Sequence, residues 1–209
     1  MDTIAKILSF LMFPLFMPLY GVILLFNLEI FSFYPAFYMK GTFLTVVLLG
    51  ILVPIFSLYI LWRFGVISDF RVYKREDRVI PYSFTAIAYF FVSYMLYRLA
   101  MPLYVVNIAI GVAFATLVDA IVSLKWKISA HATGIGGLTS AVVSICYWTH
   151  ANAIMLIVIL FLAAGLLCAA RLWLNRHTPA QLLLGFFNGF FSVLLFSFLN
   201  FGQFFRYTL

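Results

Sequence analysis

The chain has 209 residues, of which 66% are hydrophobic, 20% aromatic and only 9% charged. An ordinary soluble domain is about 25% charged, so this much apolar surface excludes a single water-soluble core and indicates an integral membrane protein. The formal net charge is +7, and because the charges fall between apolar stretches we expect lipid head groups or an anionic substrate as partners, and no nucleic acid.

Seven stretches are apolar and long enough to be spans, since about 20 helical residues cross about 30 Å of hydrocarbon. They are residues 7–26, 42–66, 82–97, 102–124, 132–149, 151–170 and 180–200. No small-residue cleavage site follows the first, so we expect a retained span. Residues 27–41 are aromatic and polar enough to lie at an interface. The sequence predicts an all-α polytopic bundle of six or seven spans, one transmembrane domain over residues 1–209, located in a bacterial inner membrane.

Some residues inside the spans are assigned to packing. Cys146 and Cys168 lie in apolar runs, which is typical of small core residues rather than of a disulfide or metal pair. The spacing Gly185-x-x-x-Gly189 lets helices approach closely. Three asparagines are expected to bond between helices, namely Asn107, Asn152 and Asn188.

Three polar connections share one membrane face if all seven spans cross, because an even number of spans separates them. They are residues 67–81, 125–131 and 171–179, in a core covering about residues 67–200. They hold 8 of the 13 basic residues and two of the three histidines. A cluster of arginine, lysine and histidine on one face is therefore the main feature of the sequence.

The first connection, "DFRVYKREDRVIPY", is rich in cations. Arg71 and Arg78 are seven residues apart, which on a helix places them on one face with Lys74 between them. Three cations so placed could bind one phosphate, the arginines through their planar forks. The alternative is a positively charged loop that only anchors the topology.

The second connection, "KWKISAHATGIGG", contains a predicted helix start. Ser129 is a suitable N-cap, which puts His131 in the first helical turn. The free N–H groups at such an end favour anions, and a neutral His131 could transfer a proton there. The alternative is an interfacial histidine without a chemical role.

The third connection also leads into a helix. Thr178 is a predicted N-cap, Pro179 fits the first helical position, and Gln181 completes a capping box. His177 then lies just outside a helix end that disfavours its protonated form, so it could serve as a nucleophile or base. Arg171, at the end of the preceding span, faces the same surface.

Together the three segments resemble the type 2 phosphatidic acid phosphatase superfamily of membrane lipid phosphatases, which is related to haloperoxidases. The family pattern is K-x6-R-P, then P-S-G-H, then S-R-x5-H-x3-D. This chain offers Arg71-x6-Arg78, then Ser129-Ala130-His131, then Arg171-x5-His177-x3-Gln181. The order and spacing agree. The departures include Arg71 in place of the lysine, with Lys74 nearby, and Gln181 in place of the aspartate.

The resemblance implies a phosphatase that forms a phosphohistidine. His177 would attack phosphorus and His131 would protonate the leaving oxygen. The phosphoryl oxygens would be held by Arg71, Arg78, Arg171 and the Ser129 hydroxyl. The expected substrates are polyprenyl diphosphate, phosphatidic acid, phosphatidylglycerol phosphate or a lipid A phosphate. No carboxylate-rich cluster suggests a metal site, so we expect metal-independent chemistry without a cofactor.

Two acid–base questions stay open at this point. Gln181 can accept one N–H bond from His177 and fix its tautomer, but it carries no charge. The alternative is that Gln181 serves the helix cap alone. Asp119, an acid inside a span, could substitute for the missing aspartate. Alternatively, Asp119 pairs with Lys125 or Lys127.

Two further functions and the orientation are also open. The chain could be a phospholipid-binding protein that kept the phosphate site but lost turnover, or a small transporter with Asp119 and the cations along its path. Counting cations between spans gives ten on the motif face against three on the other, which predicts a cytoplasmic face. The family resemblance implies the opposite face. The oligomeric state is not predicted.

Overall fold

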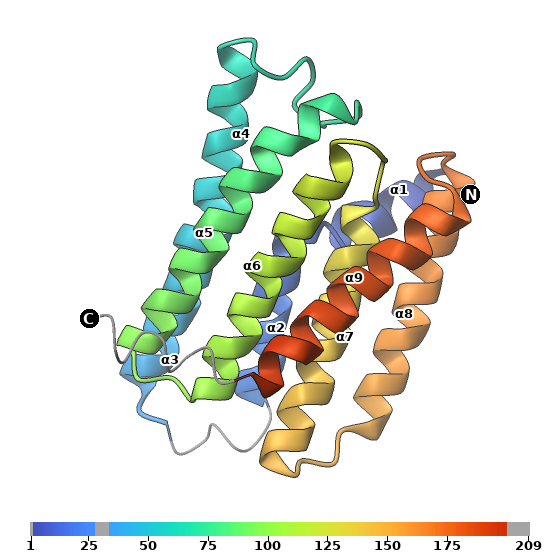
Figure 1. Cartoon of the computed structure of the whole chain (residues 1–209). Helices are drawn as coiled ribbons and strands as arrows, with labels where there is room; N and C mark the ends of the chain where they lie inside the picture. The colour runs from blue at the N-terminus through green and yellow to red at the C-terminus, as the bar shows by residue number, and fades with distance from the viewer. Residues whose placement is uncertain (1, 28–33, 200–209) are drawn as a thin grey trace.

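The protein is a bundle of helices (Figure 1). The computed structural model describes residues 2–27 and 34–199, and every regular element within these two segments is helical. In chain order they are α1 (Asp2–Leu11), η1 (Pro14–Phe16), α2 (Met17–Asn27), α3 (Ala36–Thr45), the π-helical η3 (Val46–Leu52), α4 (Val53–Arg63), η4 (Glu76–Arg78), α5 (Val79–Arg98), α6 (Leu103–Ser123), α7 (Ala130–Thr149), α8 (Ile154–Trp173) and α9 (Pro179–Phe198).

Six helical stretches are long and apolar enough to cross a membrane. They are Asp2–Asn27, Ala36–Arg63, Glu76–Arg98, Leu103–Ser123, Ile154–Trp173 and Pro179–Phe198. Each overlaps one predicted span, so the prediction of an all-α multi-pass membrane protein is confirmed. Part of the expected interfacial segment 27–41 lies outside the described residues, and the rest is largely the start of α3.

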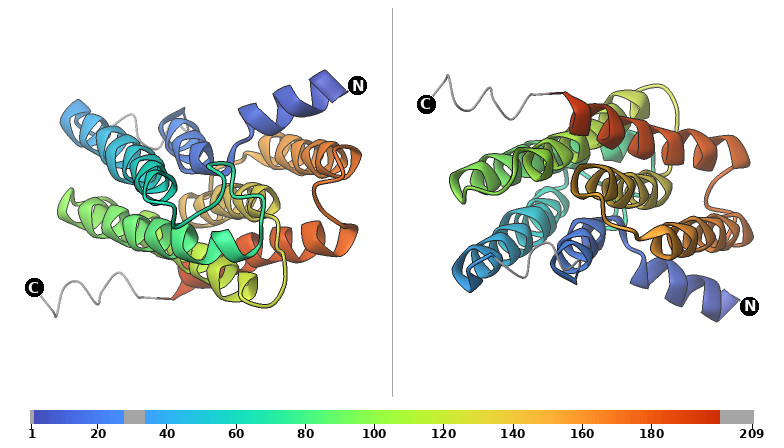
Figure 2. Two further views of the ribbon diagram at one scale, coloured as in Figure 1. Left: turned by 90° about the horizontal axis from the view of Figure 1, so that it is seen from above. Right: turned by 90° about the horizontal axis from the view of Figure 1, so that it is seen from below.

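The remaining predicted span, 132–149, corresponds to α7, which the bundle surrounds. Seen from below, α7 lies inside a ring formed by α2, α6, α8 and α9 (Figure 2). Its buried face is built from small and hydroxylated residues such as Thr139 and Ser140, which are fully buried. A helix enclosed by protein does not need the continuous apolar surface that lipid contact demands. With 20 residues, α7 is nevertheless as long as α8 and α9.

The first two spans are interrupted where proline removes a backbone donor. Pro14 begins the short turn η1 between α1 and α2. Pro54 occupies the second position of α4, directly after the π-helical segment Val46–Leu52. Proline cannot donate a hydrogen bond to the carbonyl one turn earlier. The helix before Pro54 therefore widens to a π-helix instead of continuing its regular α-helical bonding. Both breaks lie beside the cavity described below.

The closest helix contact joins α7 to α9, as the glycine spacing predicts. A Cβ atom built on Gly189 would collide with the carbonyl oxygen of Thr133, and one on Gly136 with that of Phe186. Only a residue without a side chain allows the two backbones to approach so closely. These contacts hold the middle of α9 against the first half of α7.

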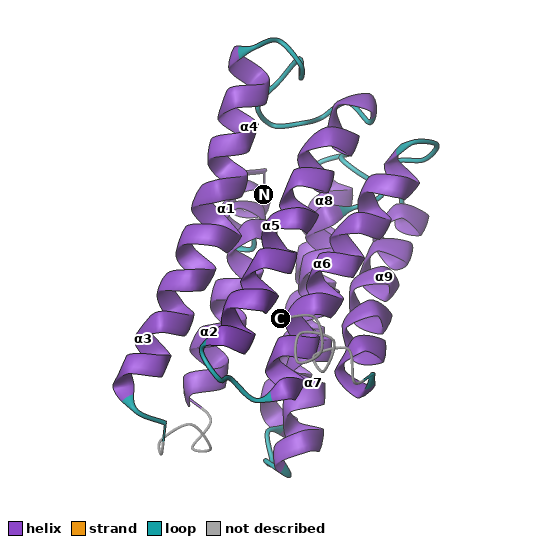
Figure 3. Cartoon of the chain, turned by 60° about the vertical axis from the view of Figure 1, so that its left-hand side comes forward, coloured by secondary structure: helices purple, strands orange, loops and turns teal. Residues whose placement is uncertain are grey.

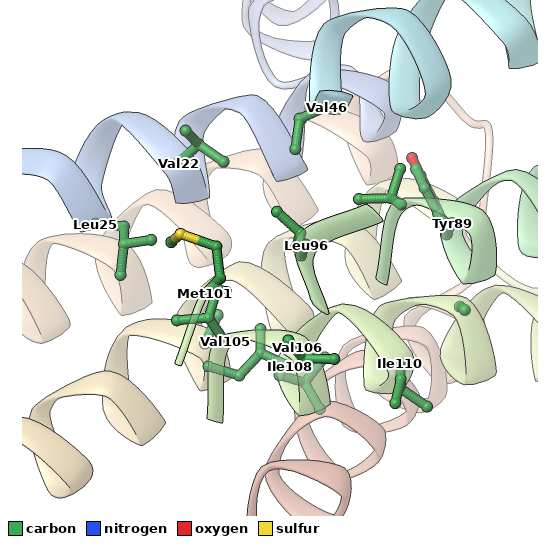
Figure 4. Packing of buried hydrophobic residues seen from close by; sticks show 14 of the residues in the cluster. Val22, Leu25, Val46, Tyr89, Leu96, Met101, Val105, Val106, Ile108 and Ile110 are labelled. Carbon is green, nitrogen blue, oxygen red and sulfur yellow. The ribbon is translucent and has the colours of Figure 1, made fainter. Parts of the chain in front are cut away.

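An apolar cluster lies in the half of the bundle away from the basic connections. Figure 4 shows side chains of α2, α5 and α6 meeting there, together with Val46 of η3. Val106 is fully buried and Leu25 and Leu96 nearly so. This cluster fixes the far ends of these helices relative to one another.

All three basic connections lie at the same end of the bundle (Figures 1 and 3). Nη1 of Arg75, in the first, donates to the carbonyl oxygen of Lys125, in the second, at 2.6 Å. The guanidinium of Arg176, in the third, lies 4.4 Å from the ring centre of Tyr73 in the first. The expectation of one shared face is confirmed.

Candidate functional site: a cationic mouth on an apolar cavity

A cavity of about 840 Å³ begins at the three basic connections and continues into the bundle. The charged and histidine side chains that line it are Lys6, Arg71, Arg78, Asp119, His131, Arg171, Arg176 and His177. Farther from the connections its walls are apolar, with lining residues that include Leu25, Val46, Leu96, Val105, Ile108 and Ile145. One continuous space therefore has a cationic mouth and an apolar interior.

Arg78 is the most firmly held cation of the mouth. It is buried, Nε donates to the carbonyl oxygen of Val72 at 3.1 Å, and Nη1 donates to that of Ile128 at 2.8 Å. Val72 has φ 51°, an uncommon conformation for a β-branched residue, which turns its carbonyl toward Arg78. No described residue accepts a hydrogen bond from Nη2 of Arg78, so Nη2 can donate to a ligand in the cavity.

The expectation that Arg71, Lys74 and Arg78 share one helical face is wrong. The α4 helix ends at Arg63, Gly65 follows it with a φ of 72°, and regular bonding resumes only at Glu76. Arg71 lies in the intervening loop, exposed, with Nη1 at 3.5 Å from the hydroxyl of Tyr73, and it reaches the cavity. Lys74 is exposed and does not line the cavity.

His131 and Ser129 lie at a capped helix start, as predicted. The Ser129 Oγ accepts the N–H of Ala132 at 3.4 Å, and His131 is the second residue of α7. Ser129 is fully buried and its hydroxyl does not line the cavity, so its expected contact with a phosphoryl group is not supported. Nε2 of His131 lies 3.1 Å from the carbonyl oxygen of Ser9 in α1. Since a carbonyl only accepts, Nε2 carries the proton and Nδ1 is the unprotonated nitrogen of a neutral ring.

His177 is fixed by the predicted capping box. Nδ1 of His177 lies 3.0 Å from Oε1 of Gln181, and the N–H of Thr178 donates to the same Oε1 at 3.3 Å. Because that atom accepts from a backbone N–H, it is the amide oxygen, so Nδ1 of His177 must donate to it. Nε2 then carries the lone pair, and this buried ring lines the cavity.

The surroundings keep His177 neutral. Burial, followed by the positive charges of Arg78, Arg171 and Lys127, lowers the pKa of His177 to about 3, although the hydrogen bond to Gln181 acts in the opposite direction. Burial, and then the neighbouring arginines, also lower the pKa of Lys127. A neutral imidazole keeps its Nε2 lone pair available to an anionic substrate, which the neighbouring cations attract.

Arg171 carries an unsatisfied donor into this site. It is half-buried near the end of α8 and lines the cavity. Its Nε is buried and has no hydrogen-bond partner among residues 2–27 and 34–199. A buried donor without a partner costs about 1–3 kcal/mol, which a bound anion would recover.

Asp119 does not pair with Lys125 or Lys127, the alternative suggested by the sequence. It is 3% exposed, and its Oδ1 accepts from Oγ1 of Thr133 at 3.0 Å and from Nδ2 of Asn188 at 2.9 Å. Both donors come from other helices, so Asp119 links α6 to α7 and α9. The Nδ1 of His177 is bonded to Gln181 instead, so Asp119 does not take the place of the missing aspartate. The prediction of an interhelical bond is confirmed for Asn188.

Sequence reasoning missed two contributors to the mouth. Lys6 and Ser9 of α1 line it, and Ser9 contacts His131. They lie more than 120 residues from His131 in the chain, and no local pattern links them. Arg176 was counted among the cations but not selected, although it precedes His177 directly and reaches the same cavity.

No group of three or more metal-ligating side chains lies close together in the described part of the chain. The expectation of metal-independent chemistry stays a prediction. Comparisons with protein-family models, with curated proteins and with solved structures gave no match. The site must therefore be interpreted from its own geometry.

Proposed function

We propose that the protein is a membrane lipid phosphatase that hydrolyses a lipid phosphate or diphosphate through a phosphohistidine on His177. The observation that carries this proposal is the single cavity that joins a cationic, histidine-containing mouth to an apolar interior. A soluble phosphate ester would not need the apolar part, and a lipid without phosphate would not need the cations. A lipid with a phosphate head group uses both.

The apolar part is long enough for a lipid chain. Along α6 the lining extends from Asp119 to Val105, which is 14 residues or about 21 Å at the rise of an α-helix. This is about two thirds of the roughly 30 Å hydrocarbon thickness of a bilayer. A lipid tail bound in the cavity would therefore lie at the same depth as the tails of the surrounding bilayer, with its head group at the membrane surface.

The chemistry follows from which atoms are free. Nε2 of His177 attacks phosphorus, a P–N bond forms, and the P–O bond to the lipid breaks, while the lipid oxygen takes a proton from a water molecule. The hydroxide left by that water attacks phosphorus, the P–N bond breaks, hydrogen phosphate leaves and Nε2 regains its lone pair. Arg78 and Arg171 stabilise the charge on the phosphoryl oxygens with Nη2 and Nε donors, and Arg71 and Arg176 add positive charge.

The resemblance to type 2 phosphatidic acid phosphatases supports the same assignment. Its three motif segments lie together in the fold, and Arg71, Arg78, His131, Arg171 and His177 line one cavity. In this family scheme His131 protonates the leaving oxygen. Here Nε2 donates to the carbonyl oxygen of Ser9 and Nδ1 of the neutral ring carries no proton, so this role requires His131 to bind a second proton first. The proposed substrates are polyprenyl diphosphate, phosphatidic acid, phosphatidylglycerol phosphate or a lipid A phosphate, in a bacterial inner membrane.

One observation favours a second candidate, lipid phosphate binding without turnover. The partner of His177 Nδ1 is the neutral amide of Gln181, which cannot stabilise a cationic ring as a carboxylate does. The cation cluster would bind the head group equally well in either case.

Phosphate release from purified protein tests the two candidates. The panel contains the four proposed substrates, each with and without EDTA, beside the variant His177→Ala. The phosphatase is supported by EDTA-resistant release that His177→Ala abolishes. Release that persists in His177→Ala removes the nucleophile assignment. Retained binding of a lipid phosphate without release identifies the binding protein.

A further inference from the structure

Asp119 is the one acid among the described residues that line the cavity, where the other charged groups are cations. No lysine or arginine of residues 2–27 and 34–199 forms an ion pair with it. A buried carboxylate without an ion pair is costly and marks a functional position more often than a structural one.

The two oxygens of Asp119 have different surroundings. Both hydrogen bonds that it accepts from described residues, from Thr133 and from Asn188, end on Oδ1. An amide oxygen would accept these two bonds as well, so linking the helices does not require the second oxygen. Oδ2 is left for whatever occupies the cavity.

Asp119 lies just inside the cationic mouth. It is four residues before the end of α6, about 6 Å from that end. On the same helical face the cavity continues past Ala115, Val112 and Ile108, all apolar. A ligand whose phosphate meets the arginines thus places the first atoms of its tail beside Asp119.

Resting on the proposed function, we propose that Oδ2 of Asp119 binds a hydrogen-bond donor on the carbon atoms next to the phosphate ester. The preferred substrates are then lipid phosphates whose backbone carries a hydroxyl or amino group at that place. Polyprenyl phosphates and diphosphates offer only C–H groups there and leave the carboxylate unpaired. The site discriminates between the two kinds of lipid phosphate because binding a polyprenyl ligand costs the free energy of leaving the Asp119 carboxylate without a hydrogen-bond donor.

A matched pair of ligands tests this preference. Hexadecyl phosphate is compared with its β-amino analogue, whose ammonium group can only donate. In the wild type we expect the amino analogue to bind about tenfold tighter, by calorimetry in detergent, and to show a higher kcat/KM for phosphate release. Equal affinity, or tighter binding of the plain alkyl phosphate, would overturn the inference.

Asp119→Asn separates ligand binding from folding. The variant keeps an oxygen for Thr133 and Asn188 but presents an NH2 group in place of Oδ2. We expect an unchanged unfolding midpoint and loss of the preference for the amino analogue. Thr116→Val, a cavity-lining change that leaves Asp119 intact, should preserve the preference.

The failures of the two proposals are distinguishable. If the wild type binds and hydrolyses both ligands and Asp119→Asn keeps the same ratio, only the role of Asp119 is wrong. If the wild type neither binds nor hydrolyses either ligand, the lipid phosphatase proposal fails, and this inference fails with it.

Discussion

Nδ1 of His177 lies 3.0 Å from Oε1 of Gln181, and this single contact sets the chemistry of the cavity mouth. The amide oxygen accepts both the imidazole N–H and the N–H of Thr178, so it caps α9 and fixes the ring at once. Nε2 is thereby presented as a lone pair to the cations. Gln181 thus caps the start of α9 and also determines which nitrogen of His177 carries the proton.

Gln181→Glu tests this relationship. Glutamate fits the same capping box, and its carboxylate would stabilise the positive charge that His177 acquires on bonding to phosphorus. We expect kcat for lipid phosphate hydrolysis to rise by at least about tenfold. Phosphate release under saturating substrate measures this. An unchanged kcat would mean that charge at this position does not limit the reaction.

Gln181→Leu provides the opposite change. It removes the acceptor for Nδ1 of His177 and for the N–H of Thr178. We expect kcat to fall by about a hundredfold through loss of the tautomer, and the free energy of unfolding to fall by about 1 kcal/mol through loss of one of the two bonds of the capping box. Thermal unfolding in detergent separates the two effects. If activity falls only in proportion to the amount of folded protein, Gln181 serves to cap α9 and does not fix the tautomer of His177.

Activity should not fall near pH 6.5, where an ordinary catalytic histidine becomes protonated. Burial, with the charges of Arg78, Arg171 and Lys127, lowers the pKa of His177 to about 3, well below the usual value of about 6.5. The neutral nucleophile therefore persists as the pH falls through 6.5. We expect kcat/KM to be flat from about pH 8 to about pH 5 where other groups do not interfere. A fall of kcat/KM with an apparent pKa near 6.5, matched by protonation of the His177 ring at that pH in NMR spectra, would contradict this.

The same lowered pKa has a consequence for stability. Between about pH 6.5 and pH 3 the unfolded chain binds a proton at His177 that the folded chain does not. Stability from this group is therefore complete above about pH 6.5 and decreases as the pH falls below it. We expect the unfolding midpoint of the wild type to drop more between pH 7 and pH 5 than that of His177→Gln. Equal drops would show that His177 is not held neutral.

The local part of the site could be predicted from the sequence. The caps at Ser129 and Thr178 depend on residues a few positions apart, so their patterns predict both helix starts and the placement of His131 and His177. The shared face of the basic connections follows from counting spans alone. Both kinds of prediction need no knowledge of how the helices pack.

The rest depends on tertiary structure. A seven-residue spacing suggested that Arg71 and Arg78 share a helix, whereas the positive φ of Val72 belongs to a loop that folds around the Arg78 side chain. The partners of Asp119 come from helices 14 and 69 residues away. No periodicity in the sequence encodes such contacts, and the cavity results from all of them together.

Gly189 should be intolerant of any side chain. A methyl group there would collide with the carbonyl oxygen of Thr133 and force α9 away from α7. We expect Gly189→Ala to lower the free energy of unfolding by about 1–3 kcal/mol, the usual cost of overpacking. Gly165→Ala is the matched control, because its Cβ would meet no atom within 4 Å. Equal unfolding midpoints for the two variants would contradict the close contact of α7 with α9.

The orientation of the site can be predicted from the distribution of charge. The end with the three basic connections carries ten of the described lysines and arginines, including Lys6 and Arg63, while Lys40 and Arg98 lie at the other end. The positive-inside rule therefore predicts that the cavity mouth faces the cytoplasm. Substrate would then enter from the inner leaflet.

Labelling of single cysteines in intact cells measures this orientation. The native Cys146 and Cys168 are first replaced by alanine, and cysteine is introduced at Lys74 or at His150, which are exposed at opposite ends of the bundle. We expect a membrane-impermeant maleimide to label His150→Cys in intact cells and Lys74→Cys only after permeabilisation. The reverse pattern would place the mouth outside the cytoplasm, as the family resemblance implies, and would show that the arginines of the mouth serve phosphate binding and not topology.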